Sequence, residues 1–423
     1  MASGPLNGIR ILEFTQIIAG PFACQNLADM GADVIKVEPP EGEPWRLAQQ
    51  FMPGESKWFQ SLNRGKQSLV LRLQDERAQK IVHDLIPSID VVVINYRPDV
   101  PARLGIDYET LSALKDDLIY VDNTAFGRKG PWAHRPGYDI VVQAVTGLMA
   151  GEAKVAADGS PEMMTSTALA DYSTGIAIAW ATCAALFHRE RTGEGQLVEA
   201  SLLVTALALQ GNNVMELPVA DAVMRTAMVE NLHKLRDEGS SYADLIAAHD
   251  PYGALRKMNI YYRPFKTSNG ALAIGALSRG LREKVRAAFE LDMPDPDDMD
   301  LTDPAVIGEA VKRVAEVEEL LQTKTTEQWM EIFDSGGVPA GPINFAEDMS
   351  SDPQVVENEF VVDLEHDLSG PQTQVAPIVK FSRSPLEARG SSPPLGRDTD
   401  EIVRSVGYSD EQIAELREAG VIA

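Results

Sequence analysis

The chain has 423 residues, of which 44% are hydrophobic and 24% are charged, and its formal net charge is −25. This length allows a large buried core and favours two domains over one. Nucleic acids and anionic membranes are bound through clustered Lys and Arg, so a chain this acidic is expected to bind neither through an extended surface. The start, MASGPLNGIRILEF, lacks a basic segment followed by a long apolar run, and no later segment reaches about 18 uninterrupted apolar residues. We therefore expect a soluble, cytoplasmic protein.

Several common kinds of site are not predicted. Cys24 and Cys183 are the two cysteines, each inside an apolar stretch, and are interpreted as small buried hydrophobes in a reducing compartment. None of the six histidines stands in an HExxH, HxH or HxxxH pattern with carboxylates at ligand spacing, so no metal site is expected. There is also no GxSxG motif, which argues against a serine hydrolase.

The first third of the chain alternates between strand and helix patterns. Residues 9–14 are a short apolar, β-branched run, a helical stretch that ends at Gly31 follows, and residues 32–37 predict a second strand. The alternation continues with strands at 68–71, 90–94 and 118–121 and helices near 76–86 and 108–115. Repeated units of this kind predict a parallel sheet covered by helices on both faces, an α/β fold.

The rest of the chain is less regular. No GxGxxG follows the first strand and no GxxxxGK[ST] occurs, so a phosphorylated ligand would not be held by the usual backbone loops. Residues 167–186 predict a buried helix, 196–209 a strand that passes into another, and 219–256 polar helices. Strands at 259–266 and 271–274 flank the turn Asn269-Gly270 and open a smaller domain, which helices at 304–321 and 326–334 complete. A last helix is expected at 409–419.

Asp171 is the most informative carboxylate. It stands in TALADYSTGIAIAWATCAALF, between a polar loop and a long apolar helix. The structural interpretation is a helix N-cap, a position that Asp strongly favours. The functional interpretation is compatible with it, because backbone N–H groups and the positive end of the helix dipole would keep the carboxylate ionised and stabilise an oxyanion beside it. Asp171 is therefore a candidate carboxylate nucleophile.

Basic side chains gather in the first third, where a parallel sheet would present its ligand-binding loops. One interpretation is ordinary surface ion pairing. The other is a site for a phosphorylated ligand, because Arg offers bidentate contacts to phosphate. The residues are Lys36, Arg46, Arg64, Lys66, Arg72, Arg97, Arg103, Arg128, Lys129 and Arg135.

Motifs along nearly the whole chain resemble the class III CoA-transferases, a family that also includes α-methylacyl-CoA racemases. They are GIRILEFTQIIAGPFACQNLADMGADVIKVEPPEGEPWR, NRGKQSLVL, VVVINYRP, ARLGIDYETL, FGRKGPWAHRPGYDIVVQAVTGLM, LADYSTG, HRERTGEGQLVEASLL and LGRDTDEIVRSVGYS, in that order. The resemblance implies a large domain with a Rossmann-like parallel sheet built from both chain ends, a small central domain, and an interlocked homodimer. On this basis residues 1–215 form the first part of the large, CoA-binding domain, 216–258 a helical linker, 259–335 the small domain, and 336–423 the return linker and the remaining large-domain part.

The resemblance also implies roles for individual residues. Asp171 matches the family's nucleophilic aspartate, which forms an anhydride and then a thioester with CoA while CoA moves from an acyl-CoA to a free carboxylic acid. No permanently bound cofactor is expected, since CoA is a substrate. Small residues such as Gly275 would present backbone N–H groups to the oxyanions. The candidate CoA ligands are Lys36, Arg46, Arg64, Lys66, Arg72, Arg97, Arg103 and Lys129.

Departures from the family pattern bear on specificity. Ile18 stands where formyl-CoA transferase has a glutamine, and Gln16 is the candidate substitute, so formate or oxalate specificity is not expected. The long segment 219–256 suggests an enclosed acyl site, and transfer within a dicarboxylic acyl-CoA, of the mesaconyl-CoA kind, is one option.

The family's racemases carry GHD where this chain has GYD with Tyr138, a weak base near neutral pH, and His134 is the nearest histidine. A transferase is therefore favoured over a racemase. The intact LADYSTG carboxylate disfavours a non-catalytic CoA-binding protein.

Overall fold

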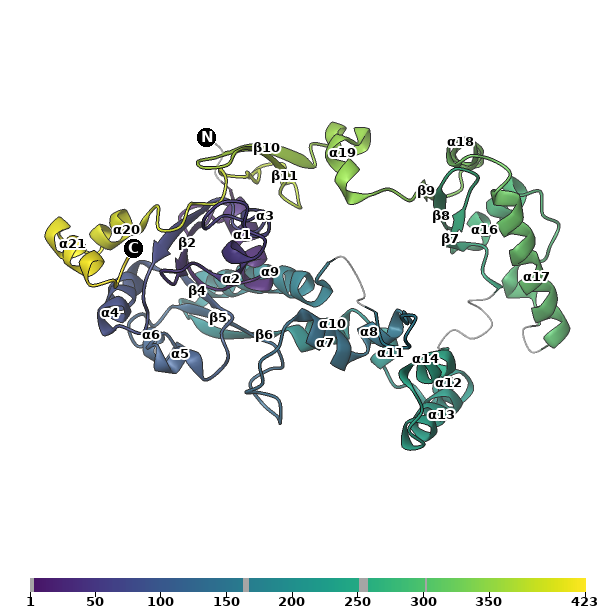
Figure 1. Cartoon of the computed structure of the whole chain (residues 1–423), viewed down its shortest axis with the longest axis horizontal. Helices are drawn as coiled ribbons and strands as arrows, with labels where there is room; N and C mark the ends of the chain where they lie inside the picture. The colour runs from purple at the N-terminus through teal and green to yellow at the C-terminus, as the bar shows by residue number, and fades with distance from the viewer. Residues whose placement is uncertain (1–3, 163–166, 251–257, 301–302) are drawn as a thin grey trace. The chain divides into compact units, whose positions relative to one another are not determined.

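The structure is a computed structural model that describes residues 4–162, 167–250, 258–300 and 303–423. The chain divides into two compact units (Figure 1). The first unit combines residues 1–216 with residues 353–423, and the second holds residues 217–352. The second unit thus contains both the segment expected as a linker, apart from residue 216, and the segment expected as the small domain.

Six parallel strands form the sheet of the first unit, which confirms the expected α/β class. Their order is β3-β2-β1-β4-β5-β6. Both ends of the chain build this unit, as expected. All six strands come from residues 10–201, and the C-terminal segment contributes covering helices and a separate hairpin. The strands are β1 (Arg10–Phe14), β2 (Asp33–Glu38), β3 (Lys66–Val70), β4 (Val91–Ile94), β5 (Ile119–Thr124) and β6 (Gln196–Ser201).

Helices cover both faces of this sheet because side chains alternate along each strand. Ile11 and Val91 bury in a core with α1 (Ala19–Asp29) and α9 (Leu169–Thr192). Leu12 and Val92 bury on the opposite face with helices from both ends of the chain. The apolar residues of segment 399–418 have helical spacing, which explains why this segment forms helices that cover this face. The helices of this second face are α4 (Glu76–Leu85), α6 (Tyr108–Ser112), α20 (Thr399–Ser405) and α21 (Asp410–Glu418).

Helix α9 is apolar because it lies against the sheet. By length and composition alone it could cross a membrane, and half of its most apolar stretch is buried inside the unit. A Cβ atom at Gly175 would lie 2.8 Å from the carbonyl oxygen of Ala19 on α1. Only glycine therefore allows α1 and α9 to approach this closely, and their contact fixes the position of the first turns of α9.

The prediction of a strand passing into another over 196–209 is wrong in its second half. Strand β6 ends at Ser201, and α10 (Leu202–Ala208) follows directly. The hydroxyl of Ser201 accepts a hydrogen bond from the N–H of Val204 at 3.3 Å and so caps this helix. Leu202 and Ala206 lie four residues apart and bury on one side of α10, which is helical periodicity and not strand alternation.

Short helices and one hairpin complete the first unit. Strands β10 and β11 pair antiparallel as the hairpin. The remaining elements are α2 (Pro44–Leu47), α3 (Lys57–Gln60), α5 (Val100–Arg103), α7 (Asp139–Thr146), α8 (Leu148–Gly151), α11 (Gly211–Val214), α19 (Pro353–Glu357), β10 (Val361–His366) and β11 (Gly370–Val375).

The second unit has its own antiparallel sheet, in the order β7-β8-β9. Leu272, Trp329 and Phe333 are buried in a core between this sheet and its helices. The elements are α12 (Pro218–Met224), α13 (Thr226–Asp237), α14 (Tyr242–Ala248), β7 (Tyr262–Lys266), β8 (Ala271–Gly275), α16 (Arg279–Ala288), α17 (Pro304–Leu321), α18 (Thr326–Gly336) and β9 (Ala340–Pro342).

Candidate functional site

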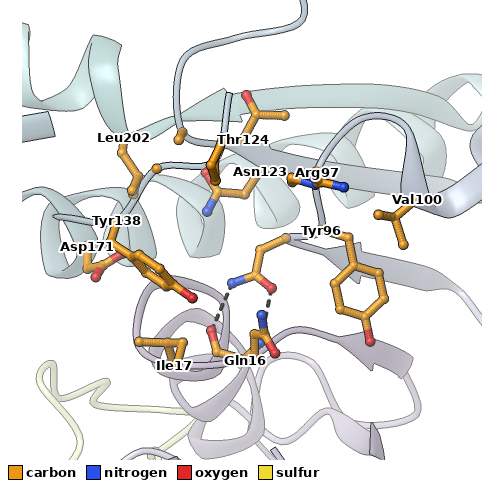
Figure 2. Close-up of a pocket in the computed structure, with 14 residues that line it drawn as sticks. Gln16, Ile17, Tyr96, Arg97, Val100, Asn123, Thr124, Tyr138, Asp171 and Leu202 are labelled. Carbon is orange, nitrogen blue, oxygen red and sulfur yellow. Dashed lines mark hydrogen bonds between the residues drawn. The ribbon is translucent and has the colours of Figure 1, made fainter. Parts of the chain in front are cut away.

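A pocket of about 310 Å³ lies at the carboxyl ends of the central strands of the first unit (Figure 2). The strand order reverses between β1 and β4, and in open α/β sheets this reversal is where ligands bind. Residues that directly follow β1 and β4, or that end β5, line the pocket together with Asp171. The full lining is Gln16, Ile17, Asn95, Tyr96, Arg97, Val100, Asn123, Thr124, Ala125, Pro136, Gly137, Tyr138, Asp171 and Leu202.

Asp171 is the third residue of α9, and 8% of it is exposed. It is not the N-cap, which is Ala168 and makes no side-chain cap hydrogen bond. The carboxylate of Asp139, at the start of α7, takes that role: its Oδ1 accepts the backbone N–H of Ala170 at 2.8 Å and of Asp171 at 3.2 Å. Gln143, one turn further along α7, donates to the other oxygen of Asp139. The cap therefore comes from a residue 32 positions earlier, and the side chain of Asp171 remains available to the pocket.

Burial and, as the smaller cause, the neighbouring Asp139 carboxylate together raise the pKa of Asp171 to about 7. Burial also raises the pKa of Asp139, although hydrogen bonds from Asp171, Ala170 and Gln143 oppose the change. The direction of the pKa change at Asp171 is opposite to the expectation that the helix N-terminus keeps this carboxylate ionised. A buried carboxyl whose pKa lies near neutrality is typical of functional sites.

Hydrogen bonds with Asn95 and Glu43 hold the turn after β1 in place. Asn95 Oδ1 accepts the N–H of Gln16 at 3.0 Å, and Asn95 Nδ2 donates to the carbonyl of Gln16 at 2.9 Å (Figure 2). Ile17 has a φ of 72°, which is rare for a β-branched residue, and its N–H donates to Glu43 Oε2 at 2.7 Å. Such strain persists only where the surroundings impose it. The side of the pocket formed by Gln16 and Ile17 is thus shaped before any ligand binds.

Lys36 and Lys66, two of the predicted CoA ligands, are buried in ion pairs. Lys36 Nζ lies 3.2 Å from Glu13 and 3.1 Å from Glu43, and Lys66 Nζ lies 2.8 Å from Glu13. Both lysine side chains are fully buried. Through Glu43, Lys36 supports the strained backbone of Ile17 and does not itself line the pocket.

Arg46 and Arg64 are also buried in ion pairs. Arg46 Nε donates to Glu38 at 2.8 Å, and the side chain is fully buried. Arg64 pairs with Asp29 at 2.6 Å and donates to the carbonyl of Val375 near the C-terminal hairpin. Since a buried guanidinium needs such partners, the burial favours a structural role for both residues.

The other four predicted CoA ligands are accessible. Arg97 lines the pocket and pairs with Asp99 at 3.3 Å, and Arg103, one turn after Asp99, lies 3.6 Å from the same carboxylate. Both side chains are at least half exposed. Arg72 is exposed and donates to a backbone carbonyl, and Lys129 is exposed in the loop after β5.

The remaining predicted site residues are divided between the units. Gln16 and Tyr138 line the Asp171 pocket, as Asp171 itself does. Gly275 ends β8 in the second unit, and its N–H donates to the carbonyl of Pro339 at 2.9 Å, so this N–H is already engaged and is not free to stabilise an oxyanion. His134 is exposed and is not among the residues that line the pocket.

Sequence reasoning missed Asp139, Asn95 and Asn123. Each had a usable signal. Asn95 and Asn123 stand where an apolar strand pattern gives way to polar residues, at the edge of a parallel sheet that binds ligands. Asp139 belongs to the GYD segment that was considered only for Tyr138.

Comparisons with known proteins agree with this geometry. Residues 6–399 match the family described as CoA-transferase family III. The human succinyl-CoA:glutarate CoA-transferase is 30% identical over 99% of this chain and 90% of its own length. The succinate–glutarate CoA-transferase of Agrobacterium fabrum is 33% identical over 94% of this chain and 95% of its own. The formyl-CoA:oxalate CoA-transferase of Rhodopseudomonas palustris is 30% identical over 99% and 97%.

Solved structures are similar as well. A CaiB/BaiF family protein from Brucella suis superposes with a TM-score of 0.74 at 28% identity, covering 96% of this chain and all of that one. The Rv3272 protein of Mycobacterium tuberculosis gives a TM-score of 0.75 at 26% identity, covering 95% of this chain and all of its own. The family match spans nearly the whole chain, and the relatives cover it from end to end. This chain therefore belongs to CoA-transferase family III.

Proposed function

We propose that this CoA-transferase uses the side-chain carboxylate of Asp171 as its nucleophile. The observation that carries the proposal is the position of Asp171: a buried carboxyl with a raised pKa, at the end of a pocket formed where the strand order reverses. Asp139 occupies the backbone N–H groups of the first turn, which leaves the Asp171 side chain directed to the pocket. Gln16 and Tyr138 supply uncharged hydrogen-bond donors on the same pocket wall.

The proposed reaction is a series of acyl exchanges. The Asp171 carboxylate attacks the carbonyl carbon of the donor thioester, and CoA leaves as a thiolate, giving a mixed anhydride. The thiolate then attacks the Asp171 carbonyl of the anhydride and releases the donor as a free carboxylate. The acceptor carboxylate attacks the resulting aspartyl-CoA thioester, and the thiolate released attacks the acceptor acyl group, which regenerates Asp171. Every intermediate is an activated acyl group, so the energy of the thioester is conserved as long as water is excluded.

The burial that raises the pKa of Asp171 makes its carboxylate more nucleophilic but lowers the fraction that is ionised near pH 7. A desolvated carboxylate is a stronger nucleophile than a hydrated one, and the same burial that raises the pKa removes its water. Only the ionised fraction can attack, however, so the free protein should gain activity as pH rises through about 7. Donors such as Gln16 and Tyr138 would stabilise the oxyanion of each tetrahedral intermediate.

Accessible basic residues remain the proposed phosphate ligands of CoA. Arg97 and Arg103 share Asp99 beside the pocket, and phosphate groups would compete for the exposed sides of both guanidinium groups. Arg72 and Lys129 are further exposed candidates. The buried ion pairs of Lys36, Arg46, Arg64 and Lys66 support a positioning role for those four residues instead.

We infer that the acids exchanged are dicarboxylic. Two of the relatives described above are named for succinate or succinyl-CoA together with glutarate, and the third for formyl-CoA and the dicarboxylic acid oxalate. All three cover nearly the whole chain. Which member of this class is preferred would be decided by the acyl end of the pocket, around Asp171, Tyr138 and Leu202.

The interlocked homodimer also remains a proposal. Ile176, Trp180 and Phe187 on α9 expose 49%, 65% and 63% of their surface. Large apolar side chains that gather on one element in this way typically mark a protein interface. Light scattering coupled to gel filtration would measure the mass of the assembly directly.

Trapping tests the nucleophile. The wild-type protein mixed with succinyl-CoA and hydroxylamine should carry a hydroxamate at Asp171, identified by peptide mass spectrometry. Asp171→Ala should fold and lose at least about three orders of magnitude in CoA exchange between succinate and glutarate. Asp158→Ala, which removes an exposed carboxylate, is the matched control and should exchange CoA at the wild-type rate. Near-normal exchange by folded Asp171→Ala would refute the mechanism.

A further inference from the structure

Asn123 is the second-last residue of β5 and faces the same side of the sheet as Asp171. Side chains alternate along a strand, and Ile119 and Val121, which share the face of Asn123, bury in the core that α9 covers. Asn123 is 4% exposed and lines the pocket. In the view of Figure 2 its carboxamide lies between Asp171 and Arg97.

The carboxamide oxygen of Asn123 can accept a hydrogen bond that no described residue supplies. Within the parts of the chain that the structure describes, this buried Oδ1 atom has no hydrogen-bond partner. The other asparagine of the pocket differs, because Asn95 uses both ends of its carboxamide on the backbone of Gln16. A buried acceptor without a partner costs free energy in the free protein, and a ligand that brings a donor to it recovers that cost. Asn95 is therefore structural, and Asn123 is set up for a ligand.

The missing group must be a hydrogen-bond donor, and the reactants offer few. This step rests on the proposed function. Ionised carboxylates and the phosphates of CoA only accept hydrogen bonds. The adenine amino group and the ribose hydroxyl lie on the far side of those phosphates from the thioester. The pantetheine arm, which joins the phosphates to the thioester, carries two amide N–H groups and one hydroxyl.

The arm would also have to pass Asn123. If phosphates contact Arg97 and the thioester reaches Asp171, the arm spans the part of the pocket where Asn123 lies (Figure 2). We propose that Asn123 Oδ1 accepts a hydrogen bond from an amide N–H of the pantetheine arm and so sets how far the thioester enters the pocket toward Asp171. Asn123 is thus a binding residue for the arm and not for the phosphates or the exchanged acid.

Two ligands distinguish binding through the pantetheine arm from binding through the phosphates. Calorimetry would measure the Kd of CoA, and of 3′,5′-ADP, which has phosphates and no arm, for the wild type and for Asn123→Leu. The variant should bind CoA about tenfold more weakly, equivalent to about 1.4 kcal/mol, and bind 3′,5′-ADP as the wild type does. Asn358→Leu, which lies directly after α19 and outside the pocket, is the control and should bind both ligands normally.

A chemical change in the ligand keeps the test valid even if Asn123→Leu does not fold. Pantetheine in which one or the other amide nitrogen is methylated lacks one donor, and one of the two compounds should bind the wild-type protein about tenfold more weakly than pantetheine itself. Equal weakening of CoA and 3′,5′-ADP in a folded Asn123→Leu protein would overturn the proposal. So would an unchanged Kd of CoA with a raised KM for the acceptor acid, which would assign Asn123 to the acid. A wild-type protein that binds no CoA at all would instead refute the proposed function.

Discussion

Replacing Asp139 by asparagine should separate the two effects of this residue on Asp171. The amide oxygen of asparagine can accept the N–H groups of Ala170 and Asp171 that Asp139 Oδ1 accepts at 2.8 and 3.2 Å, so the cap of α9 is retained. The negative charge beside Asp171 is lost. The pKa of Asp171, about 7, lies roughly three pH units above its ordinary value, which corresponds to about 4 kcal/mol in favour of the neutral acid.

The expected change is a part of that total. Burial is the larger cause of the raised pKa and is unchanged in Asp139→Asn, so we expect the pKa of Asp171 to fall by about one pH unit, or about 1.4 kcal/mol. In the proposed mechanism the carboxylate is the nucleophile, so kcat/KM should decline as pH falls through this pKa, and the decline should begin at lower pH in the variant. Burial raises the pKa of Tyr96 in the pocket and of Tyr172 on α9, so neither tyrosine is expected to ionise below pH 8.

The assay is CoA exchange measured as kcat/KM from pH 5 to pH 9. The wild type should lose half of its limiting activity near pH 7, and Asp139→Asn near pH 6. Asp139→Ala removes both charge and cap, and should in addition lower the free energy of unfolding by about 1 kcal/mol. Superimposable pH profiles for the wild type and Asp139→Asn would refute the coupling between the two carboxylates. A wild-type midpoint near pH 4 would refute the raised pKa itself.

Three further outcomes follow from burial and charge. Asp171 stays protonated up to about pH 7 in the folded protein but only to about pH 4 in the unfolded chain. Its protonated form therefore favours folding at low pH, and this contribution is lost as pH rises from about 4 through about 7. Asp171→Asn should raise the urea midpoint at pH 8 and change it little at pH 4, and an equal gain at the two pH values would contradict the raised pKa. Lys36→Met removes the ion-pair partner of the buried Glu43 carboxylate and one of the two lysines that pair with Glu13, and should lower the free energy of unfolding by about 3–5 kcal/mol in urea titrations. Arg103→Ala should change the free energy of unfolding by less than about 0.5 kcal/mol and weaken CoA binding. Trp180→Glu should lower the mass seen by light scattering if α9 forms the homodimer interface, and an unchanged mass would exclude Trp180 from that interface.

The α/β class could be predicted from the sequence because its signals are local. A strand such as Val91–Ile94 is a continuous apolar run, as expected for a strand buried on both faces, and the helices between strands carry their apolar residues at helical spacing. The position of Asp171 in the first turn of α9 was predictable for the same reason, since a polar loop gives way there to a long apolar helix. The error over 202–208 has a local origin too, because a short apolar run fits either strand or helix until its cap is recognised.

Partners far apart in sequence decided the chemistry of the site. No spacing rule connects Asp139 to the N–H of Asp171, or Glu43 to that of Ile17, and these contacts form only when separate loops meet at the edge of the sheet. Arg46 resembles a phosphate ligand in sequence, yet it is buried against Glu38 and bonds a carbonyl 347 residues away. The sequence by itself thus determined which residue types are present and which strand or helix each of them belongs to. Only the tertiary structure decided which charges are buried and paired and which remain for a ligand, because burial and hydrogen bonding depend on contacts between segments that the order of residues does not specify.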